Sequence, residues 1–317
     1  MLRAQDLTGL AEEAQARPRV IAVVGPTASG KTDLAIAVAE ALGGEIISVD
    51  SMQVYRGLDI GTAKPDAAAR ARVPHHLLDV AEPGEEFSAA RFALVADAAA
   101  AAIAARGRAV IACGGTGLYL RAWLDGLFEA PAADPAIRAR HRELGPAEVA
   151  ARLAAVDPAA AAAIQPNDLV RLSRALEVYE QTGVPITELR RRAARGRRYR
   201  ARIVGVDPPR AELYRRIDGR FAAMMAAGLV DEVRRVIDRY GPQVRPLGAL
   251  GYRQIRAHLL GELESAEAVR LAQRDTRHFA RRQLTWFRAE PGVAWHPDAA
   301  AVDVAALARF LANEGDG

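Results

Sequence analysis

The first part of the chain alternates short apolar runs with longer amphipathic segments. The apolar runs are predicted to be strands and lie at residues 20–24, 45–50, 75–80 and 109–113. The segments at 33–42 and 87–105 carry apolar residues at helical spacing and are predicted to be helices. This alternation is typical of an α/β fold in which helices cover both faces of a parallel sheet.

The pattern changes near residue 131 to helical segments rich in Ala, Arg and Glu. Asp134-Pro135 and Asp157-Pro158 are helix-start signals within this part. A strand returns at residues 202–207 and leads into another helix, and a short strand is expected at 293–296. We therefore predict a core of residues 18–130 and 201–317, interrupted by a helical insertion of residues 131–200.

The sequence GPTASGKT at residues 25–32 lies between the first strand and the first helix. This is a P-loop in its expected setting, where backbone N–H groups and a helix N-terminus bind phosphate. The core is therefore predicted to be P-loop NTPase-like. The expected diphosphate-binding residues are Gly25, Pro26, Thr27, Ala28, Ser29, Gly30, Lys31 and Thr32, and Thr32 is the expected ligand of Mg²⁺.

Only two of the 43 basic residues are lysines, Lys31 and Lys64. Such a bias suggests that lysine is kept where a compact ammonium suits a phosphate better than a planar guanidinium does.

Two further loops should meet the P-loop, because the carboxyl ends of parallel strands share one edge of the sheet. One begins at Asp50 and the other is the glycine turn at 114–119. Asp50 could accept a proton from a nucleophile. Asp50 and Ser51 could instead simply cap a turn.

Charge divides the chain unevenly. Residues 1–130 carry 12 basic and 16 acidic groups, whereas residues 131–317 carry 31 and 23, a net charge of +8. A polyanion is expected to meet this second part. The single cysteine, Cys113, is expected in the core. The sequence contains neither a membrane span nor the apolar core of a signal peptide, so we expect a cytoplasmic protein. We also expect a monomer.

Six motifs together resemble the tRNA dimethylallyltransferase (tRNA isopentenyltransferase) family over nearly the whole chain. They are GPTASGKT (25–32), DSMQVYRGLDIGTAKP (50–65), GGTGLYL (114–120), RALEVYEQTG (174–183), GYRQ (251–254) and RRQLTWFR (281–288). The resemblance implies transfer of a dimethylallyl group from dimethylallyl diphosphate to N6 of the adenosine 3′ of the anticodon, in tRNAs that read codons beginning with U. It also implies a helical insertion that binds the anticodon stem.

The resemblance gives the predicted site residues their roles. Asp50 is the expected base for the adenine amine, and Thr27, Lys31 and Thr32 with Mg²⁺ stabilise the leaving diphosphate. An arginine from the helix after residue 207 is expected to assist, and Arg220 is favoured over Arg216. The target base must be flipped out of the anticodon loop to reach this site.

The same resemblance implies a set of tRNA contacts. These are Asp50, Ser51, Met52, Gln53, Thr116, Arg138, Arg171, Arg174, Arg253, Arg282 and Gln283. Arg274, Arg277, Arg281 and Arg288 recur at helical spacing, which suits either backbone contact or a solvent-exposed face. The run at residues 189–202, with eight arginines, could be an RNA-contacting flap or a charged surface loop. His75 and His76 are expected to be structural.

Three other functions remain open from the residues. A small-molecule kinase would use the P-loop for ATP but leaves the basic helical part without a purpose. An adenylate isopentenyltransferase shares the chemistry but needs no RNA-binding insertion, and a pure RNA-binding module does not account for Lys31 and Asp50.

Overall fold

The computed structural model describes residues 17–128, 131–193 and 197–313. The chain forms two compact units, one of Met1–Leu124 with Arg198–Gly317 and the other of Asp125–Arg197. The expected insertion was 131–200, so the structural boundary lies six residues earlier at its start and three earlier at its end.

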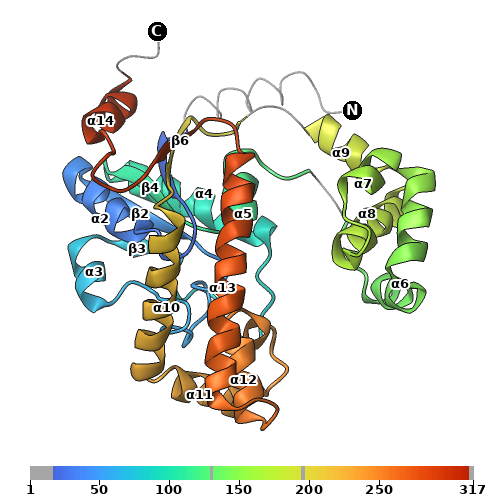
Figure 1. The fold of residues 1–317 in the computed structure, drawn as a ribbon. Coiled ribbons are helices and arrows are strands. Elements are labelled where there is room, and N and C mark those ends of the chain that lie inside the picture. The colour runs from blue at the N-terminus through green and yellow to red at the C-terminus, as the bar shows by residue number, and fades with distance from the viewer. Residues whose placement is uncertain (1–16, 129–130, 194–196, 314–317) are drawn as a thin grey trace. The chain divides into compact units, whose positions relative to one another are not determined.

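Unit 1 is built on a six-stranded parallel sheet with the order β3-β2-β4-β1-β5-β6 (Figure 1). In chain order the strands are β1 (Val20–Val24), β2 (Gly44–Val49), β3 (His75–His76), β4 (Ala109–Gly114), β5 (Ala201–Val206) and β6 (Val293–His296). Val24 of the central strand pairs with Gly114 on one side and Gly205 on the other. The strand ends are therefore level where the P-loop begins, and the predicted α/β fold is confirmed.

The third strand is shorter than predicted. The sequence analysis placed a strand at 75–80, but only His75 and His76 pair with β2. Leu77 and Asp79 have φ angles of 62° and 57°, and this left-handed backbone cannot continue an extended strand. The prediction for residues 77–80 was wrong because these residues form a loop in which Leu77 is buried and Val80 is exposed.

Alternate residues of the central strand enter two different cores. Val20, Ala22 and Val24 belong to the larger one, and Ile21 and Val23 belong to the other. This is the period of two expected for a strand that is buried on both faces. Helices α2 (Lys31–Leu42) and α14 (Val304–Ala312) contribute to the smaller core.

The larger core is covered by α4 (Ala89–Ala105), α5 (Gly117–Leu124) and the C-terminal helices. The latter include α11 (Leu229–Tyr240), α12 (Tyr252–Leu259) and α13 (Ser265–Arg288). The remaining elements of unit 1 are α3 (Ala67–Arg72), α10 (Arg210–Ala226) and the 3₁₀ helix Arg245–Gly248. The long helices α10 and α13 contact each other (Figure 1).

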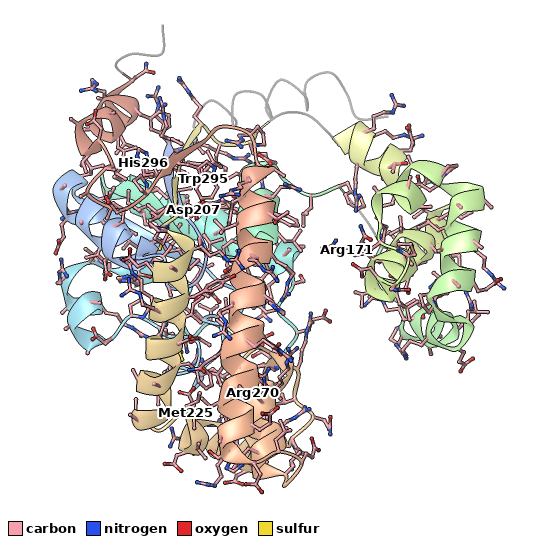
Figure 2. All side chains as sticks on the ribbon, viewed as in Figure 1. Arg171, Asp207, Met225, Arg270, Trp295 and His296 are labelled. Carbon is pink, nitrogen blue, oxygen red and sulfur yellow. The ribbon has the colours of Figure 1, made fainter. Side chains whose placement is uncertain are left out.

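The edge strand β6 is fixed by a close aromatic contact. A Cβ at Gly205 would lie 2.5 Å from the ring of Trp295, so only glycine fits beneath that ring. Asp207 N–H donates to the carbonyl of His296 at 2.9 Å, just past the paired strands (Figure 2). The strand predicted at 293–296 is confirmed.

Unit 2 is helical and has its own core. It contains α6 (Pro135–Val156), α7 (Pro158–Ala163), α8 (Leu169–Thr182) and α9 (Ile186–Ala193). The predicted caps are confirmed, because the carboxylates of Asp134 and Asp157 accept N–H bonds from the first turns of α6 and α7. Glu177 is fully buried in this unit and binds Arg138 and Arg174.

Candidate active site

The three loops expected to meet do line one cavity of about 430 Å³ in unit 1. Lys31 and Thr32 come from the P-loop, Asp50 follows β2, and Thr116 follows β4. Helices α10, α12 and α13 supply much of the remaining wall. The topology explains the convergence, since all three loops leave the same edge of a parallel sheet.

The P-loop has the backbone of a phosphate cradle. Ala28 and Gly30 have φ angles of 64° and 91°, so the chain turns tightly before α2 begins at Lys31. A Cβ at Gly25 would lie 2.7 Å from the carbonyl oxygen of Val206, which leaves no room for a side chain there. Successive N–H groups in such a turn, together with the helix N-terminus, form an anion site.

The ammonium of Lys31 folds back over this loop and donates to the carbonyl of Pro26 at 3.1 Å. Burial is the main cause that lowers the pKa of Lys31 below its ordinary value. Cys113 opposes this shift, Arg220 adds to it, and Asp50 opposes it. A bound anion would relieve the cost of burying this cation.

The two candidate arginines on α10 differ in position. Arg220 lines the cavity, is half-buried, and has its pKa lowered chiefly by burial. Arg216 is exposed, donates to the carbonyl of Ser29 at 3.3 Å and pairs with Glu212. Arg220 is therefore placed to meet a ligand, whereas Arg216 supports the P-loop backbone from outside.

Asp50 caps a turn with one oxygen and leaves the other without a hydrogen bond from the described residues. Its Oδ1 atom accepts N–H bonds from Met52 at 2.8 Å and Gln53 at 3.3 Å, which closes a turn. Among the described residues no hydrogen bond reaches Oδ2, and the residue lines the cavity. One oxygen thus fixes the loop while the other remains available to a ligand.

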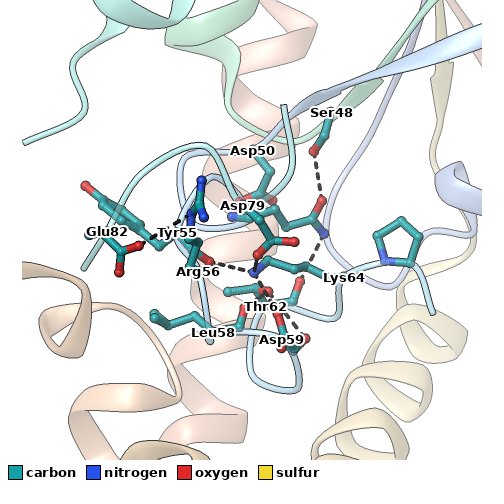
Figure 3. Close-up of polar contacts among 12 residues, drawn as sticks. Ser48, Asp50, Tyr55, Arg56, Leu58, Asp59, Thr62, Lys64, Asp79 and Glu82 are labelled. Atoms are coloured by element: carbon teal, nitrogen blue, oxygen red, sulfur yellow. Dashed lines mark hydrogen bonds and ion pairs between the residues drawn. The ribbon is translucent and has the colours of Figure 1, made fainter. Parts of the chain in front are cut away.

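Lys64 does not bind phosphate, contrary to the expectation from lysine usage. Its side chain is 1% exposed, and its ammonium contacts the Tyr55 carbonyl at 2.6 Å, Asp59 at 2.7 Å and Asp79 at 2.6 Å (Figure 3). Three oxygens around a compact ammonium explain why lysine stands here. Lys64 thus ties the end of the Asp50 loop to the middle of that loop and to Asp79 of the segment after β3. Lysine counting could not separate that role from anion binding.

Glu232 on α11 is a site-supporting residue that the sequence analysis missed. It is 2% exposed, and its carboxylate accepts N–H bonds from Asp59, Ile60 and Gly61 at 2.7 to 3.0 Å. The hydroxyl of Tyr252 donates to it at 2.7 Å. A Cβ at Gly61 would lie 2.5 Å from the Tyr252 ring, so the GTAKP and GYRQ motifs fit against each other. The sequence offered only one indication of this contact, namely that both motifs occur in the same chain.

The two predicted glutamines line the cavity with their amides already engaged. Gln53 accepts from Ser48 Oγ at 2.8 Å and donates to the carbonyls of Thr62 and Ala63. Gln283 accepts from Thr27 N–H at 2.9 Å and donates to the Gly115 carbonyl at 3.0 Å. Both residues therefore shape the cavity by holding its loops.

The arginines implied as tRNA contacts fall into two groups. Those in unit 2 are Arg138 and Arg174, both bound to buried Glu177, and the exposed Arg171 on α8 (Figure 2). In unit 1, Arg253 and Arg282 line the cavity, together with Ser51, Met52 and Thr116. Arg253 is also paired with Asp275.

The arginine stripe on α13 carries compensating carboxylates. Arg274 pairs with Asp275, Arg277 with Asp218, and Arg288 with Asp207, while Arg281 is exposed. The stripe is thus less positive than its sequence suggests.

The arginine-rich run at 189–202 divides between the units. Arg191 and Arg192 pair with Glu188, Arg197 pairs with Asp125, and Arg198 pairs with Asp97. Arg195 lies outside the described residues. The other described arginines of this run contact uncharged groups as well: Arg190 and Arg202 lie over the rings of Phe128 and Phe310, and Arg200 donates to Asn313 Oδ1.

Cys113 lies in the smaller core as expected, and it also lines the cavity together with His75. Cys113 is buried, and burial raises its pKa to about 11. His75 Nδ1 contacts the Val73 carbonyl at 2.8 Å, and His76 Nε2 contacts Glu45 at 2.6 Å.

The apolar part of the cavity wall was not predicted. It includes Phe221, Met224, Leu250 and Phe279. Met224 follows Arg220 by one helical turn, so both side chains project from the same face of α10. A ligand with a charged end and a short hydrocarbon end fits such a wall.

The donor set also fits a magnesium ion that is shared with a ligand. Thr32 offers a hydroxyl and Asp50 a carboxylate oxygen, and both line the cavity. Mg²⁺ usually takes one or two protein oxygens and completes its shell with phosphate and water. In the described part of the chain no cluster of three acidic, His or Cys residues forms a closed metal site.

Comparison with known proteins places this cavity in a family. Family models described as "IPP transferase" and "Isopentenyl transferase" match residues 53–290 and 18–75. The chain belongs to the IPP transferase family. A tRNA dimethylallyltransferase from Anaeromyxobacter sp. (strain K) is 57% identical over 92% of this chain and 96% of its own. A tRNA dimethylallyltransferase 1 from Trichlorobacter lovleyi is 49% identical over 93% and 100%.

Solved structures of IPP transferases agree with the fold. A tRNA isopentenylpyrophosphate transferase from Bacillus halodurans is 38% identical, with a TM-score of 0.69 over 94% of this chain and 96% of its own. A eukaryotic dimethylallyltransferase acting on tRNA has a TM-score of 0.79 at 24% identity over 94% and 80%, which supports the fold. The predicted family is confirmed, and among the described helices none is long and apolar enough to cross a membrane.

Proposed function

We propose that this protein is a tRNA dimethylallyltransferase that moves the dimethylallyl group of dimethylallyl diphosphate to N6 of the adenosine 3′ of the anticodon. The observation that carries the proposal is the composition of the cavity. Lys31 and Arg220 offer positive charge, Asp50 offers a carboxylate, and Met224 and its neighbours offer an apolar wall. The relatives named above support tRNA as the acceptor.

The P-loop binds the diphosphate as a leaving group. As the bond between the allylic carbon and the diphosphate oxygen breaks, negative charge accumulates on that oxygen. The loop amides, Lys31 and Arg220 stabilise this charge more strongly than they stabilise the ground state. Thr32 would hold a magnesium ion through its hydroxyl, and such an ion would supply further electrostatic stabilisation of the diphosphate.

Asp50 accepts the proton that N6 loses while the new carbon–nitrogen bond forms. An exocyclic amine is a weak nucleophile that becomes acidic on alkylation, so a nearby carboxylate is required. The Oδ2 atom is suited to this role because Oδ1 is already committed to the turn. The products are the prenylated adenosine, free diphosphate and a protonated Asp50.

The acceptor base must leave the anticodon loop to enter this cavity. We assign the anticodon stem to unit 2, with Arg171 as a phosphate contact, and the mouth of the cavity to Arg253 and Arg282. The protein is proposed to act in the cytoplasm as a monomer and to modify tRNAs that read codons beginning with U.

Incubation with prenyl-labelled dimethylallyl diphosphate and separate pools of tRNA, AMP and ATP tests the proposal. Label in tRNA alone supports it. Label in AMP or ATP would indicate an adenylate isopentenyltransferase. ATP consumption without prenyl transfer would indicate a kinase.

A further inference from the structure

Gln283 on α13 joins two loops that belong to different strands. Thr27 N–H donates to its Oε1 at 2.9 Å, and its Nε2 donates to the Gly115 carbonyl at 3.0 Å. The side chain is 7% exposed. Only one orientation of the amide satisfies both partners, because Thr27 offers a donor and Gly115 an acceptor. Gln283 thereby fixes the position of the P-loop relative to the glycine turn.

The connection continues from the glycine turn to Asp50. Thr116 N–H donates to the Val49 carbonyl at 3.2 Å, and its Oγ1 accepts from Ser51 N–H at 3.0 Å. These bonds hold the residues on either side of Asp50. An unbroken series of bonds thus runs from Thr27 through Gln283 and the glycine turn to the Asp50 loop.

Gly115 leaves space for this amide. A Cβ at that position would lie 2.2 Å from Nε2 of Gln283 and 3.5 Å from the Gly25 carbonyl oxygen. The first distance is impossible and the second is an ordinary contact. The obstacle to a side chain at Gly115 is therefore Gln283 itself.

We propose that Gln283 is a positioning residue that sets the separation between the P-loop and Asp50. The inference rests on the proposed function, since that separation matters only if a diphosphate leaves one loop while a proton goes to the other. It departs from the resemblance, which implies that Gln283 contacts tRNA. Small errors in such a separation lower the rate strongly, because the reacting groups must approach along one line.

Gln283→Met tests the proposal, since methionine has a similar volume and makes neither hydrogen bond. We expect kcat/KM for dimethylallyl diphosphate to fall about 10- to 100-fold at saturating tRNA. The Kd for tRNA should be unchanged, and hydrogen exchange in residues 25–32 should be faster. Gln273→Met is the matched control, because Gln273 lies on the same helix and, within the described structure, its side chain donates only to the Asp218 carbonyl.

A weaker tRNA Kd with unchanged donor kinetics would overturn the proposal in favour of a tRNA contact. Unchanged donor kinetics with unchanged tRNA Kd would also overturn it. If the wild-type protein transfers no prenyl group, the proposed function fails, and binding of inorganic diphosphate still tests the inference. Gln283→Met should weaken that binding and loosen residues 25–32, and an unchanged result would refute the positioning role.

A double substitution gives an independent test through Gly115. Gly115→Ala should lower donor kcat/KM because its Cβ displaces the Gln283 amide. Adding Gln283→Ala should cause little further loss, because both changes break the same connection. Losses that multiply would show that Gly115 and Gln283 act separately.

Discussion

At the scale of single residues, Lys31 is a partly buried cation on the cavity wall that can pair with an anion. Its ammonium has one carbonyl partner, and burial disfavours its charged form. Lys31→Ala should therefore reduce kcat and kcat/KM for dimethylallyl diphosphate. The lost transition-state stabilisation should be about 1.5 to 3 kcal/mol, the value of a charge-assisted contact. tRNA binding, measured by filter retention, should survive. If the variant turns over normally but no longer binds tRNA, the P-loop binds a different ligand from the one proposed.

The lowered pKa of Lys31 also predicts a pH dependence. Diphosphate binding favours the charged ammonium, so affinity is complete below the pKa of Lys31 in the free protein and is lost as the pH rises through it. Because burial lowers that pKa, the loss should begin at a lower pH than an exposed lysine would give. Calorimetric titration with dimethylallyl diphosphate above pH 8 should show this slope, and Lys31→Ala should remove it. The same slope in both proteins would exclude Lys31 as its source.

Asp50→Asn separates a base from a turn cap. Asparagine can still accept the two N–H bonds through one oxygen, but it cannot take a proton. Turnover should fall about 10² to 10⁴-fold, with little change in the binding of either substrate. The assay is repeated across a magnesium titration. Rescue by high Mg²⁺ would replace the base role with a metal role, and near-normal turnover would exclude both.

At the scale of elements, the Asp50 loop is shaped by α11 and α12 as much as by its own sequence. Glu232 accepts four hydrogen bonds while fully buried, three of them from the loop backbone. Glu232→Gln presents an amide NH₂ group to donors, which leaves buried N–H groups without a partner. We expect a loss of about 1 to 3 kcal/mol in the free energy of unfolding and a lower kcat.

Urea unfolding measures the first effect and single-turnover assays the second. Asp231→Asn is the neighbouring control, because Asp231 is exposed and pairs only with Arg234 in the described structure. Its unfolding free energy should change by less than about 0.5 kcal/mol. Equal effects of the two substitutions would contradict the role given to Glu232.

The order of the strands and helices could be predicted from the sequence, and so could the sheet edge at which the site loops meet. Both predictions rest on local signals, namely the spacing of apolar residues and the P-loop motif. The prediction of a strand at 75–80 was wrong beyond His76 because Leu77 and Asp79 adopt a left-handed backbone conformation, which an apolar pattern does not reveal. Lys64, Glu232 and Gln283 act through contacts with residues 5 to 256 positions away, and most of these partners are too distant for a local pattern to define the roles. The apolar wall at Met224 was likewise not predicted, because the helix after residue 207 was considered only for Arg216 and Arg220.

At the scale of the whole molecule, positive charge is concentrated in the second part of the chain but is partly neutralised. The salt dependence of tRNA binding therefore reports which arginines meet phosphate. Arg171→Gln should reduce the slope of log K against log salt by about one, because the exposed side chain is held only by a 3.4 Å pair.

Arg174→Gln is the contrasting variant within unit 2. Arg174 binds buried Glu177 at 2.7 Å and the Pro131 carbonyl at 2.8 Å, so its loss should lower the melting temperature of the protein. Any loss of tRNA affinity in Arg174→Gln should result from this lower stability rather than from a lost phosphate contact. If Arg171→Gln leaves the salt slope unchanged, Arg171 is a solvated surface group and the stem contact lies elsewhere.

The central claim is that the P-loop holds a leaving group rather than a phosphoryl donor. It is tested by one single-turnover experiment with dimethylallyl diphosphate labelled separately in the prenyl carbon and in phosphorus. The account predicts that the carbon label enters tRNA while all the phosphorus label appears as free diphosphate, in equal amounts. Phosphorus label on tRNA or on the protein, or release of a monophosphate, would contradict it.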